Sequence, residues 1–457
     1  MQMMSTRKFK IKSEIVELES GKTASAEALQ QSVEERRKDY AQAGVAPGER
    51  ILLYAWPGID FFVSLFAIQE IGAVPFIVDS FQTSAEQLAM TSATSPHWVV
   101  DRSLQKHSAT TKPPLPQDTA MVLFTSGTSA APKAVIHRHE NLTSRFESAR
   151  RAIPLAERQK ALCVLPLHFG HGLIGIALQT IQDGKSLVLA PKLDLQQASK
   201  VGEWIDAYGI DFVSGTPASW SLIARFSPPP RQASLQRVQL ASAHTTKKLF
   251  SEIAQWAKAP VFHCYGLTET ASWISDASVD LEADEFPVGT GERWETQFRI
   301  DSNGQIQVGT KSLFAGYWGE WTPGTAQPDW YNTGDLGHLR ADGQLLLTGR
   351  LKRQINRGGV KVSPEEVELA ILETGLVSEV VVVEASMAHQ GDVSSIAAVV
   401  IAEAATDREA LIQNLETKLR IVLSASKIPS SWRFVDRIPR RSNGKPDLVE
   451  IGLLLSR

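Results

Sequence analysis

The chain has 457 residues, of which 43% are hydrophobic, so it can bury a sizeable core and form more than one domain. Its formal net charge of -3 gives no basis for binding nucleic acid or an anionic membrane surface. The two cysteines, Cys163 and Cys264, stand far apart between apolar neighbours, which argues against a disulfide framework and favours a reducing, cytoplasmic location. The basic N-terminus lacks the apolar segment of a signal peptide, and the span 61–78 is too interrupted by polar residues to cross a bilayer.

Strand-length apolar runs alternate with amphipathic helical patterns through most of the chain. The runs predict strands at 51–54, 73–78, 120–124, 161–165, 186–190 and 212–213, and the pattern at 60–71 predicts an amphipathic helix. Pro75 is expected to restrict the pairing of its strand. This alternation predicts an α/β fold with parallel sheets. The segment 304–347, where Gly and Asp interrupt short runs, predicts a small barrel or a meander.

The pattern changes after Gly349. A charged turn at 350–361 precedes an expected helix from Pro364, strands at 380–383 and 396–401, and a helix at about 407–422. These elements predict a compact α+β unit. We therefore expect two domains, 1–349 and 350–457, with the boundary close to Lys352.

The segment 123–133 reads LFTSGTSAAPK and follows an apolar strand. Glycine allows a tight turn that directs backbone N–H groups toward an anion, while hydroxyls and a lysine add donors and positive charge. The segment therefore predicts a polyphosphate-binding loop, although it lacks the GxxxxGK pattern of a Walker-type loop. An ordinary surface loop is the alternative for one such match. The residues concerned are Thr125, Ser126, Gly127, Thr128 and Lys133.

Two further segments place a carboxylate close to a glycine turn. In the segment 265–270, Tyr265 is suited to stacking on a purine, Thr268 to binding a phosphate oxygen, and Glu269 to binding Mg²⁺, which prefers hard oxygen ligands. In the segment 331–337, Asp335 is suited to binding both hydroxyls of a ribose. The alternatives are a strand-end turn with a surface acid in the first segment and a hairpin turn in the second.

The last two segments are basic. The segment 349–368 contains Arg350, Lys352 and the pair Gly358-Gly359, and it leads into a helix with proline in its first turn. The segment 438–445 places Lys445 on a glycine turn near the C-terminus. Taken alone, the first segment could be an ordinary basic loop before a helix, and Lys445 in the second could be an ordinary solvated lysine.

In their order and spacing, the five segments resemble the adenylate-forming superfamily, which contains acyl-CoA synthetases, adenylation domains of peptide synthetases, and luciferases. The resemblance extends over about residues 45–445. It implies a large N-terminal domain with the acid and ATP pockets, and a small, mobile C-terminal domain. It also implies ATP, Mg²⁺, and either coenzyme A or the phosphopantetheine of a carrier protein as cofactors.

The resemblance also implies roles for individual residues. Lys445 would be the catalytic lysine of adenylation, together with Thr268 at the α-phosphate and Glu269 at Mg²⁺, for which Thr128 is a second candidate ligand. Lys352 would be the hinge, and the pair Gly358-Gly359 would line the pantetheine tunnel. The cofactor-binding residues would be Thr125, Ser126, Gly127, Thr128, Lys133, Ser242, Ala243, His244, Tyr265, Gly266, Asp335, Arg350, Gly358 and Gly359.

The segment 165–173 resembles the acid-pocket motif of the family. It lacks the aspartate that amino-acid-activating domains use to pair an α-amine, so we expect a hydrophobic aryl or aliphatic acid. The HxxH spacing of His168 and His171 lacks further ligands and does not predict a metal site. The expected pocket residues are His168, Phe169, Gly170, His171, Gly215, Thr216, Pro217 and Cys264.

The expected function is therefore an acid–thiol ligase that makes an acyl-adenylate and passes the acyl group to coenzyme A. Two alternatives stay open. One is a stand-alone adenylation enzyme that loads a carrier protein in trans, and the other is a non-catalytic nucleotide-binding protein. Alanines at positions 130 and 134, where the family usually has glycine, weakly favour the latter.

Overall fold

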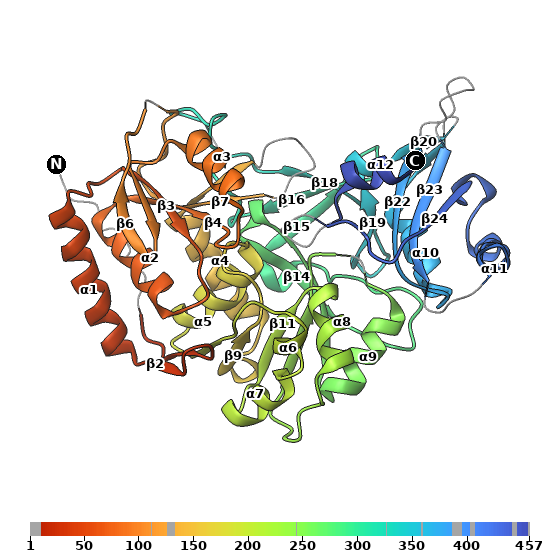
Figure 1. Cartoon of the computed structure of the whole chain (residues 1–457), viewed down its shortest axis with the longest axis horizontal. Coiled ribbons are helices and arrows are strands. Elements are labelled where there is room, and N and C mark those ends of the chain that lie inside the picture. The colour runs from red at the N-terminus through yellow and green to blue at the C-terminus, as the bar shows by residue number, and fades with distance from the viewer. Residues whose placement is uncertain are drawn as a thin grey trace.

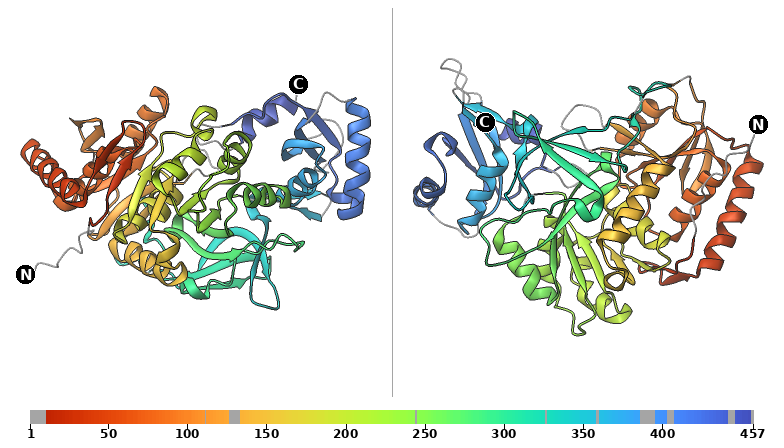
Figure 2. Two further views of the ribbon diagram at one scale, coloured as in Figure 1. Left: turned by 90° about the horizontal axis from the view of Figure 1, so that it is seen from below. Right: turned by 180° about the vertical axis from the view of Figure 1, so that it is seen from behind.

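The computed structural model describes residues 11–110, 112–125, 133–243, 245–325, 327–357, 360–385, 395–402, 407–440 and 446–455. A larger body is followed by a smaller C-terminal part (Figure 1). Helix α1 (Ala26–Ala43) lies at one end of the molecule and the C-terminal part at the other, both in that view and in the reverse view of Figure 2.

A seven-stranded sheet forms one layer of the larger body. Its inner strands β3, β4, β5 and β7 pair in parallel, whereas β6, β8 and β17 pair antiparallel at the two edges. Every residue of β3 and β4 is buried, as expected for strands covered on both faces. The strand order is β17 (Gly316–Tyr317), β8 (Ala134–Arg138), β7 (Thr119–Phe124), β4 (Val74–Val78), β3 (Arg50–Tyr54), β5 (Trp98–Asp101) and β6 (Ser103–Lys106).

An eight-stranded sheet forms the second layer. Its six central strands pair in parallel, and β14 and β2 pair antiparallel at the edges. The strand order is β14 (Ser272–Ser278), β13 (Val261–Leu267), β12 (Arg237–Leu240), β11 (Phe212–Gly215), β9 (Lys160–Cys163), β10 (Ser186–Leu189), β1 (Ile15–Glu17) and β2 (Lys22–Ala24).

Helices fill the space between these two sheets and cover their outer faces. One hydrophobic core joins side chains of both sheets with α2 (Ile59–Ile71), α4 (His139–Ala152) and the π-helix His171–Leu178. A second core packs α7, α8 and α9 on the other face of the eight-stranded sheet. The remaining helices of the larger body are α3 (Ser84–Thr94), α5 (Gln179–Gln182), α6 (Leu195–Ala198), α7 (Val201–Tyr208), α8 (Pro217–Phe226) and α9 (Lys247–Ala257).

The third sheet contains four antiparallel strands in the order β15 (Thr296–Ile300), β16 (Gln305–Thr310), β18 (Tyr331–Leu339) and β19 (Leu345–Arg350). The two outer strands do not pair with one another in the described part of the chain, so the sheet is open. The sequence predicts a small barrel or a meander for the segment 304–347, and the observed sheet is a meander.

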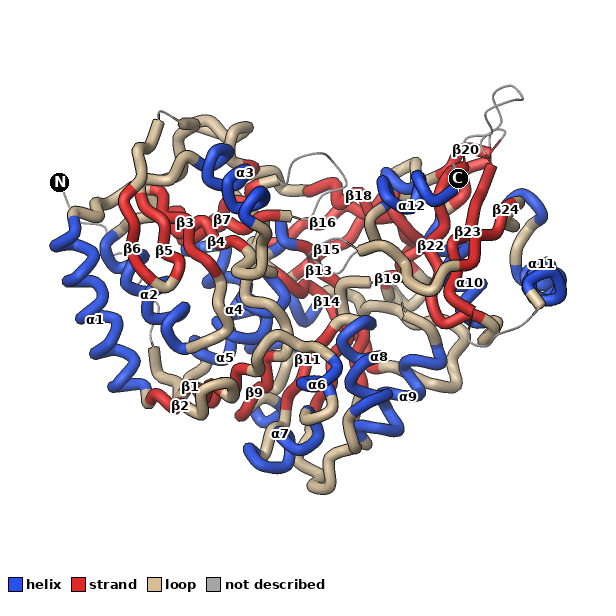
Figure 3. The backbone as a smooth tube through the Cα atoms, viewed as in Figure 1, coloured by secondary structure: helices blue, strands red, loops and turns tan. Residues whose placement is uncertain are grey.

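The C-terminal part begins with the hairpin β20 (Ile355–Arg357) and β21 (Val360–Val362). A three-stranded sheet follows, in the order β22 (Val377–Ala385), β23 (Ser395–Ala402) and β24 (Ser431–Phe434). Alternate residues of β22 and β23 point to opposite faces, so α10 (Pro364–Glu373) and α11 (Arg408–Val422) cover one face and α12 (Leu448–Leu455) covers the other (Figure 3).

The fold class expected from the sequence is confirmed: a large α/β body of several sheets precedes a smaller α+β part. Strand β4 shows the local effect of Pro75, because pairing with β7 begins only at the next residue, Phe76. The position nevertheless lies in a central strand, since Pro75 pairs with Ile51 on the other side. Within the described ranges, no helix is long and apolar enough to cross a membrane.

Candidate active site

The predicted phosphate loop connects two antiparallel strands. Strand β7 ends at Phe124 and β8 begins at Ala134, and the Thr125 amide donates a hydrogen bond to the Lys133 carbonyl at 2.9 Å. The two ends of the loop are therefore fixed by the hairpin. The predicted residues Ser126, Gly127 and Thr128 lie outside the described residues, and their role stays a prediction.

Lys133 and Glu269 approach the same tyrosine, although they lie far apart in the sequence. The Lys133 Nζ is 4.0 Å from the centre of the Tyr317 ring, and the Tyr317 hydroxyl donates to Glu269 Oε1 at 2.7 Å. The Tyr317 oxygen also lies 2.8 Å from the Tyr331 hydroxyl. Burial and the charge of Glu269 raise the pKa of both tyrosines, so both hydroxyls keep their protons. Sequence reasoning missed the role of Tyr317, because its position depends on β17 pairing with β8.

A tight turn presents the Glu269 side chain. Strand β13 ends at Leu267, and a single 3₁₀ turn, Thr268–Thr270, follows. The Thr270 hydroxyl accepts from the Leu267 amide at 2.9 Å, while Gly266 lies against the backbone of β14. A Cβ atom at this glycine would clash with the Ser272 carbonyl oxygen, so the close approach needs glycine.

The predicted ribose ligand Asp335 accepts from two predicted site residues. Its Oδ2 accepts from the Tyr265 hydroxyl at 2.8 Å, and its Oδ1 lies 3.0 Å from Arg350 Nε. Burial and the Asp335 charge raise the pKa of Tyr265 well above its ordinary value, so this tyrosine stays a neutral donor. The Tyr265 ring is 5% exposed and packs near Phe298, and its stacking on an adenine stays a prediction.

The predicted acid-pocket histidines occupy different surroundings. His171 Nε2 lies 2.8 Å from the Ser214 hydroxyl and its Nδ1 lies 3.0 Å from the Ser242 hydroxyl, so the histidine connects the expected acid and adenine regions. The loss of hydration, reinforced by the Arg145 charge, lowers the pKa of His171 to about 3, which makes its ring neutral. His168 instead lies 3.5 Å from Asp79 and packs against Phe169.

Other predicted pocket residues lie on or directly after strands β11 and β13 of the eight-stranded sheet, on either side of β12. Gly215 ends β11 next to Trp220, and Thr216 caps α8, whose first residue is Pro217. Cys264 is buried within β13. The carboxyl ends of parallel strands therefore bring these segments to one edge of the sheet, where ligands of open α/β sheets commonly bind. Gly170 precedes the π-helix, and Ala243 follows Ser242, whereas His244 lies outside the described residues.

A fully buried cation lies behind His171. The Arg145 guanidinium is 4.8 Å from the Trp294 ring and 5.6 Å from the Trp273 ring, and Trp273 meets His171 edge-on at 5.0 Å. Burial lowers the pKa of Arg145 to about 9. Sequence reasoning gave no signal for this residue, because an arginine within a helix is normally exposed.

Within the described residues, hydrogen bonds between a side chain and the backbone connect the C-terminal part to the larger body. The Ser363 hydroxyl donates to the Thr348 carbonyl at 2.9 Å, and the Lys247 amide donates to Glu373 Oε1 at 2.8 Å. Lys352, the predicted hinge, is exposed in the short 3₁₀ turn Leu351–Arg353. The predicted residues Gly358, Gly359 and Lys445 lie outside the described residues.

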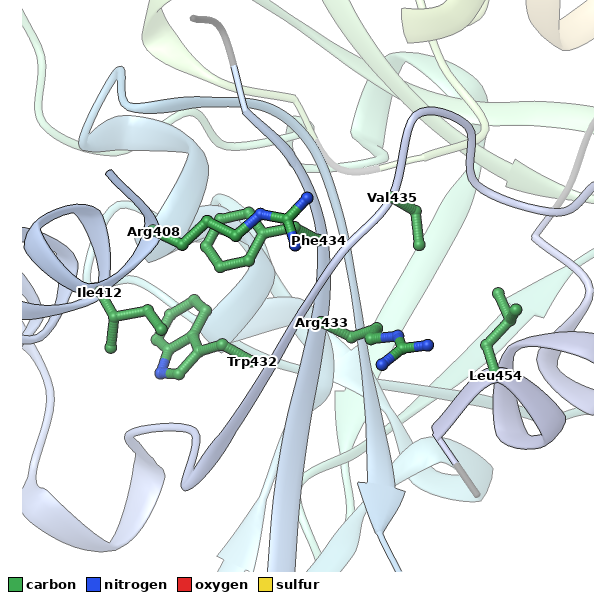
Figure 4. Close-up of a pocket in the computed structure, with 7 residues that line it drawn as sticks. All are labelled: Arg408, Ile412, Trp432, Arg433, Phe434, Val435 and Leu454. Carbon is green, nitrogen blue, oxygen red and sulfur yellow. The ribbon is translucent and has the colours of Figure 1, made fainter. Parts of the chain in front are cut away.

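The described chain also contains a cavity of about 420 Å³ in the C-terminal part, remote from these residues. It follows the outer strand β24 between α11 and α12 (Figure 4). Arg408 and Arg433 contribute positive charge, and Trp432 and Phe434 contribute aromatic surface. None of the residues predicted from the sequence lines this cavity.

The chain belongs to the adenylate-forming superfamily, since residues 87–318 match the AMP-binding enzyme family and residues 366–445 match the AMP-binding enzyme C-terminal domain. Relatives include acyl-CoA synthetase ALT10 of Alternaria alternata, 28% identical with 72% of this chain and 64% of that protein aligned. Another is the 2-succinylbenzoate–CoA ligase of Bacillus cereus, which is 25% identical over an alignment that covers 94% of this chain and 93% of that protein. The chain thus spans less than two thirds of the length of the Alternaria relative.

Solved structures share this fold. The o-succinylbenzoate CoA synthetase of Bacillus subtilis, in complex with its acyl-adenylate intermediate, superposes with a TM-score of 0.80 at 20% identity, covering 94% of this chain and 93% of that one. An anthranilate CoA ligase in complex with anthranoyl-AMP also superposes with a TM-score of 0.80 at 18% identity, covering 97% of this chain and 94% of that one. The two-part architecture expected from the sequence is therefore the architecture of adenylate-forming enzymes.

Proposed function

We propose that the protein uses ATP to activate a carboxylic acid and then transfers the acyl group to the thiol of coenzyme A. The arrangement of Lys133, Tyr317 and Glu269 carries this proposal, because it places the end of the phosphate loop next to a buried carboxylate. Family membership and relatives that are named CoA ligases support the same reaction class.

In the first step, a carboxylate oxygen of the acid bonds to the α-phosphorus of ATP, and the bond to the departing pyrophosphate breaks. Both partners are anionic, and two unit charges 4 Å apart repel by about 4 kcal/mol at an effective dielectric constant near 20. Lys133 supplies positive charge at the phosphate loop, and Lys445 is proposed to neutralise the reacting groups. The acid needs no general base, since it is ionised at neutral pH.

The residues present fit a magnesium ion. Glu269 is 9% exposed and offers hard carboxylate oxygens, which suit this cation. Bound Mg²⁺ supplies positive charge that offsets the charge of the phosphates. Asp335 and Arg350 are proposed to hold the ribose, which orients the nucleotide for attack.

In the second step, the sulfur of the thiol bonds to the acyl carbon, the thiol loses its proton, and AMP leaves. The family resemblance assigns this step to a second arrangement of the C-terminal part, in which Lys445 moves away and the pair Gly358-Gly359 lines the thiol channel. This is a domain movement of the closure type.

The acid is proposed to be hydrophobic, either aryl or aliphatic. The neutral His171 ring, the neighbouring Trp273 and the small residues at the strand ends support an uncharged pocket. No aspartate stands in the motif at 165–173 to pair an α-amine, which disfavours amino acids.

ATP–pyrophosphate exchange across a panel of aryl, aliphatic and amino acids tests the proposal. We expect exchange that depends on a hydrophobic acid and is lost in Glu269→Gln, whereas the exposed-site control Glu252→Gln keeps it. Mass spectrometry then shows whether coenzyme A or a phosphopantetheine-carrying protein accepts the acyl group. Absence of exchange with every acid, combined with retained nucleotide binding, would favour the non-catalytic alternative.

A further inference from the structure

Tyr317 connects three groups of the candidate site that come from different parts of the chain. Its ring lies under Lys133 Nζ at 4.0 Å, and its hydroxyl donates to Glu269 Oε1 at 2.7 Å. The same hydroxyl lies 2.8 Å from that of Tyr331. The contact to Glu269 is thus one of several that hold Tyr317 in a single position.

The direction of this hydrogen-bond chain follows from proton counting. A tyrosine has one hydroxyl proton, and a carboxylate can only accept, so the Tyr317 proton points to Glu269. With the Tyr317 proton on Glu269, a hydrogen bond between the two tyrosines takes its proton from the Tyr331 hydroxyl, which also interacts with Glu269 itself. Hydrogen bonds in such a chain polarise one another, so Tyr331 strengthens the donor that Tyr317 presents.

The hydroxyl is not required to hold the loop around Glu269. The Glu269 carbonyl already accepts from the Phe314 amide at 2.8 Å, and the Phe314 ring packs against Tyr317 and Tyr331. The backbone position and the aromatic packing are therefore fixed without the hydroxyl. What the hydroxyl adds is an orientation of the carboxylate itself.

We propose that Tyr317 is a positioning residue, whose hydroxyl fixes the Glu269 carboxylate for the divalent cation that accompanies ATP. This inference rests on the proposed function, in which Glu269 binds that cation. The bond to Oε1 leaves other lone pairs of the carboxylate available, since a carboxylate offers about four acceptor positions. Groups that hydrogen-bond to metal-binding carboxylates are known to orient them for the metal.

Tyr317→Phe isolates the hydroxyl, because the ring under Lys133 and against Phe314 is kept. Mn²⁺ serves as the probe: its binding to the full chain with α,β-methylene-ATP is followed by the loss of the free-ion signal in electron paramagnetic resonance. We expect a dissociation constant about 10–100-fold higher than in the wild type. Tyr331→Phe should raise it by a smaller factor, because the 2.7 Å hydrogen bond from Tyr317 to Glu269 is kept in that variant.

Tyr40→Phe is the matched control. Tyr40 is also buried and its hydroxyl also bonds to a side chain, that of Ser64 at 3.2 Å, but it lies in α1. We expect this variant to bind Mn²⁺ like the wild type. Circular dichroism melts of all variants identify a loss of folding, and if Tyr317→Phe does not fold, Tyr331→Phe decides.

A Tyr317→Phe dissociation constant within about twofold of the wild-type value overturns the inference. An equal rise in Tyr40→Phe also overturns it, because the effect is then not specific to this chain of hydroxyls. Failure of the proposed function looks different: the wild type itself then shows no acid-dependent pyrophosphate exchange. Exchange in the wild type together with unchanged Mn²⁺ binding in Tyr317→Phe rejects the positioning role alone.

Discussion

Replacing Asp335 by asparagine tests the proposed nucleotide site without changing the shape of the side chain. Asp335 is 6% exposed, and its two oxygens face different partners, Tyr265 and Arg350. Asparagine keeps one acceptor oxygen and replaces the other with an NH₂ donor. One of the two partners therefore faces a donor in the variant, and the negative charge is lost.

The expected effects on stability and on binding arise from different contacts. The Arg350 side chain is 51% exposed, so solvent screens the ion pair and it contributes at most about 1 kcal/mol to stability. A buried Tyr265 hydroxyl left without its acceptor costs about 1–3 kcal/mol. Two ribose hydroxyls that donate to a carboxylate would together contribute about 3–6 kcal/mol to binding. Because asparagine keeps one acceptor oxygen, about half of this contribution, about 1.5–3 kcal/mol, should be lost, so the affinity for AMP should fall at least about tenfold.

Isothermal titration with AMP and urea denaturation measure the two effects separately. Tyr265→Phe removes the buried hydroxyl alone and should reduce stability with a smaller effect on AMP binding. Asp329→Asn, at an exposed position, controls for the loss of one negative charge. AMP affinity that is equal in the wild type and Asp335→Asn would refute the assignment of Asp335 to the ribose.

Three further predictions concern a buried histidine, the two buried cysteines and a glycine in close contact with the backbone. Burial lowers the pKa of His137 to about 3, so between about pH 6.5 and pH 3 this residue gains a proton only in the unfolded chain. Its contribution therefore lowers the free energy of unfolding by about 1.4 kcal/mol for each unit by which the pH falls over this range. Urea denaturation of His137→Gln at a series of pH values should show a free energy of unfolding that depends on pH less steeply by this amount. An unchanged pH dependence would contradict the prediction. Burial raises the pKa of Cys163 to about 12 and also that of Cys264, so Ellman's reagent should label both thiols only after denaturation; rapid labelling of the native protein would count against this. Gly266→Ala forces a Cβ atom against the Ser272 carbonyl and should destabilise the fold by about 1–3 kcal/mol in thermal melts, whereas an unchanged melting temperature would show that the turn adapts.

Local sequence patterns were sufficient for most of the regular elements. The buried strand β3 and the capped helix α10 each carry a signal within their own residues, namely a continuous apolar run and proline in the first turn. Helix α2 forms where the sequence predicts a helix, but every position from 61 to 68 is buried, so the helix is buried all round rather than amphipathic. The glycine and hydroxyl pattern likewise indicated the segments of the candidate site. These features depend on short-range sterics and periodicity, which a single sequence contains.

Contacts between distant segments were not predictable in the same way. Tyr317 and Glu269 are 48 positions apart, and their contact depends on the pairing of β17 with β8. His171 meets Ser214 and Ser242 because parallel strands bring their ends together. Such contacts follow from sheet order, which the hydrophobic pattern of one strand does not specify.

A crystal structure of the full chain with AMP is the most direct test of the central claim, that the nucleotide binds between the phosphate loop and the two carboxylates Glu269 and Asp335. We expect both ribose hydroxyls within hydrogen-bonding distance of the Asp335 carboxylate, and the phosphate at the loop that ends at Lys133. A nucleotide bound elsewhere, with the Asp335 carboxylate still bonded only to Tyr265 and Arg350, would contradict the proposed site.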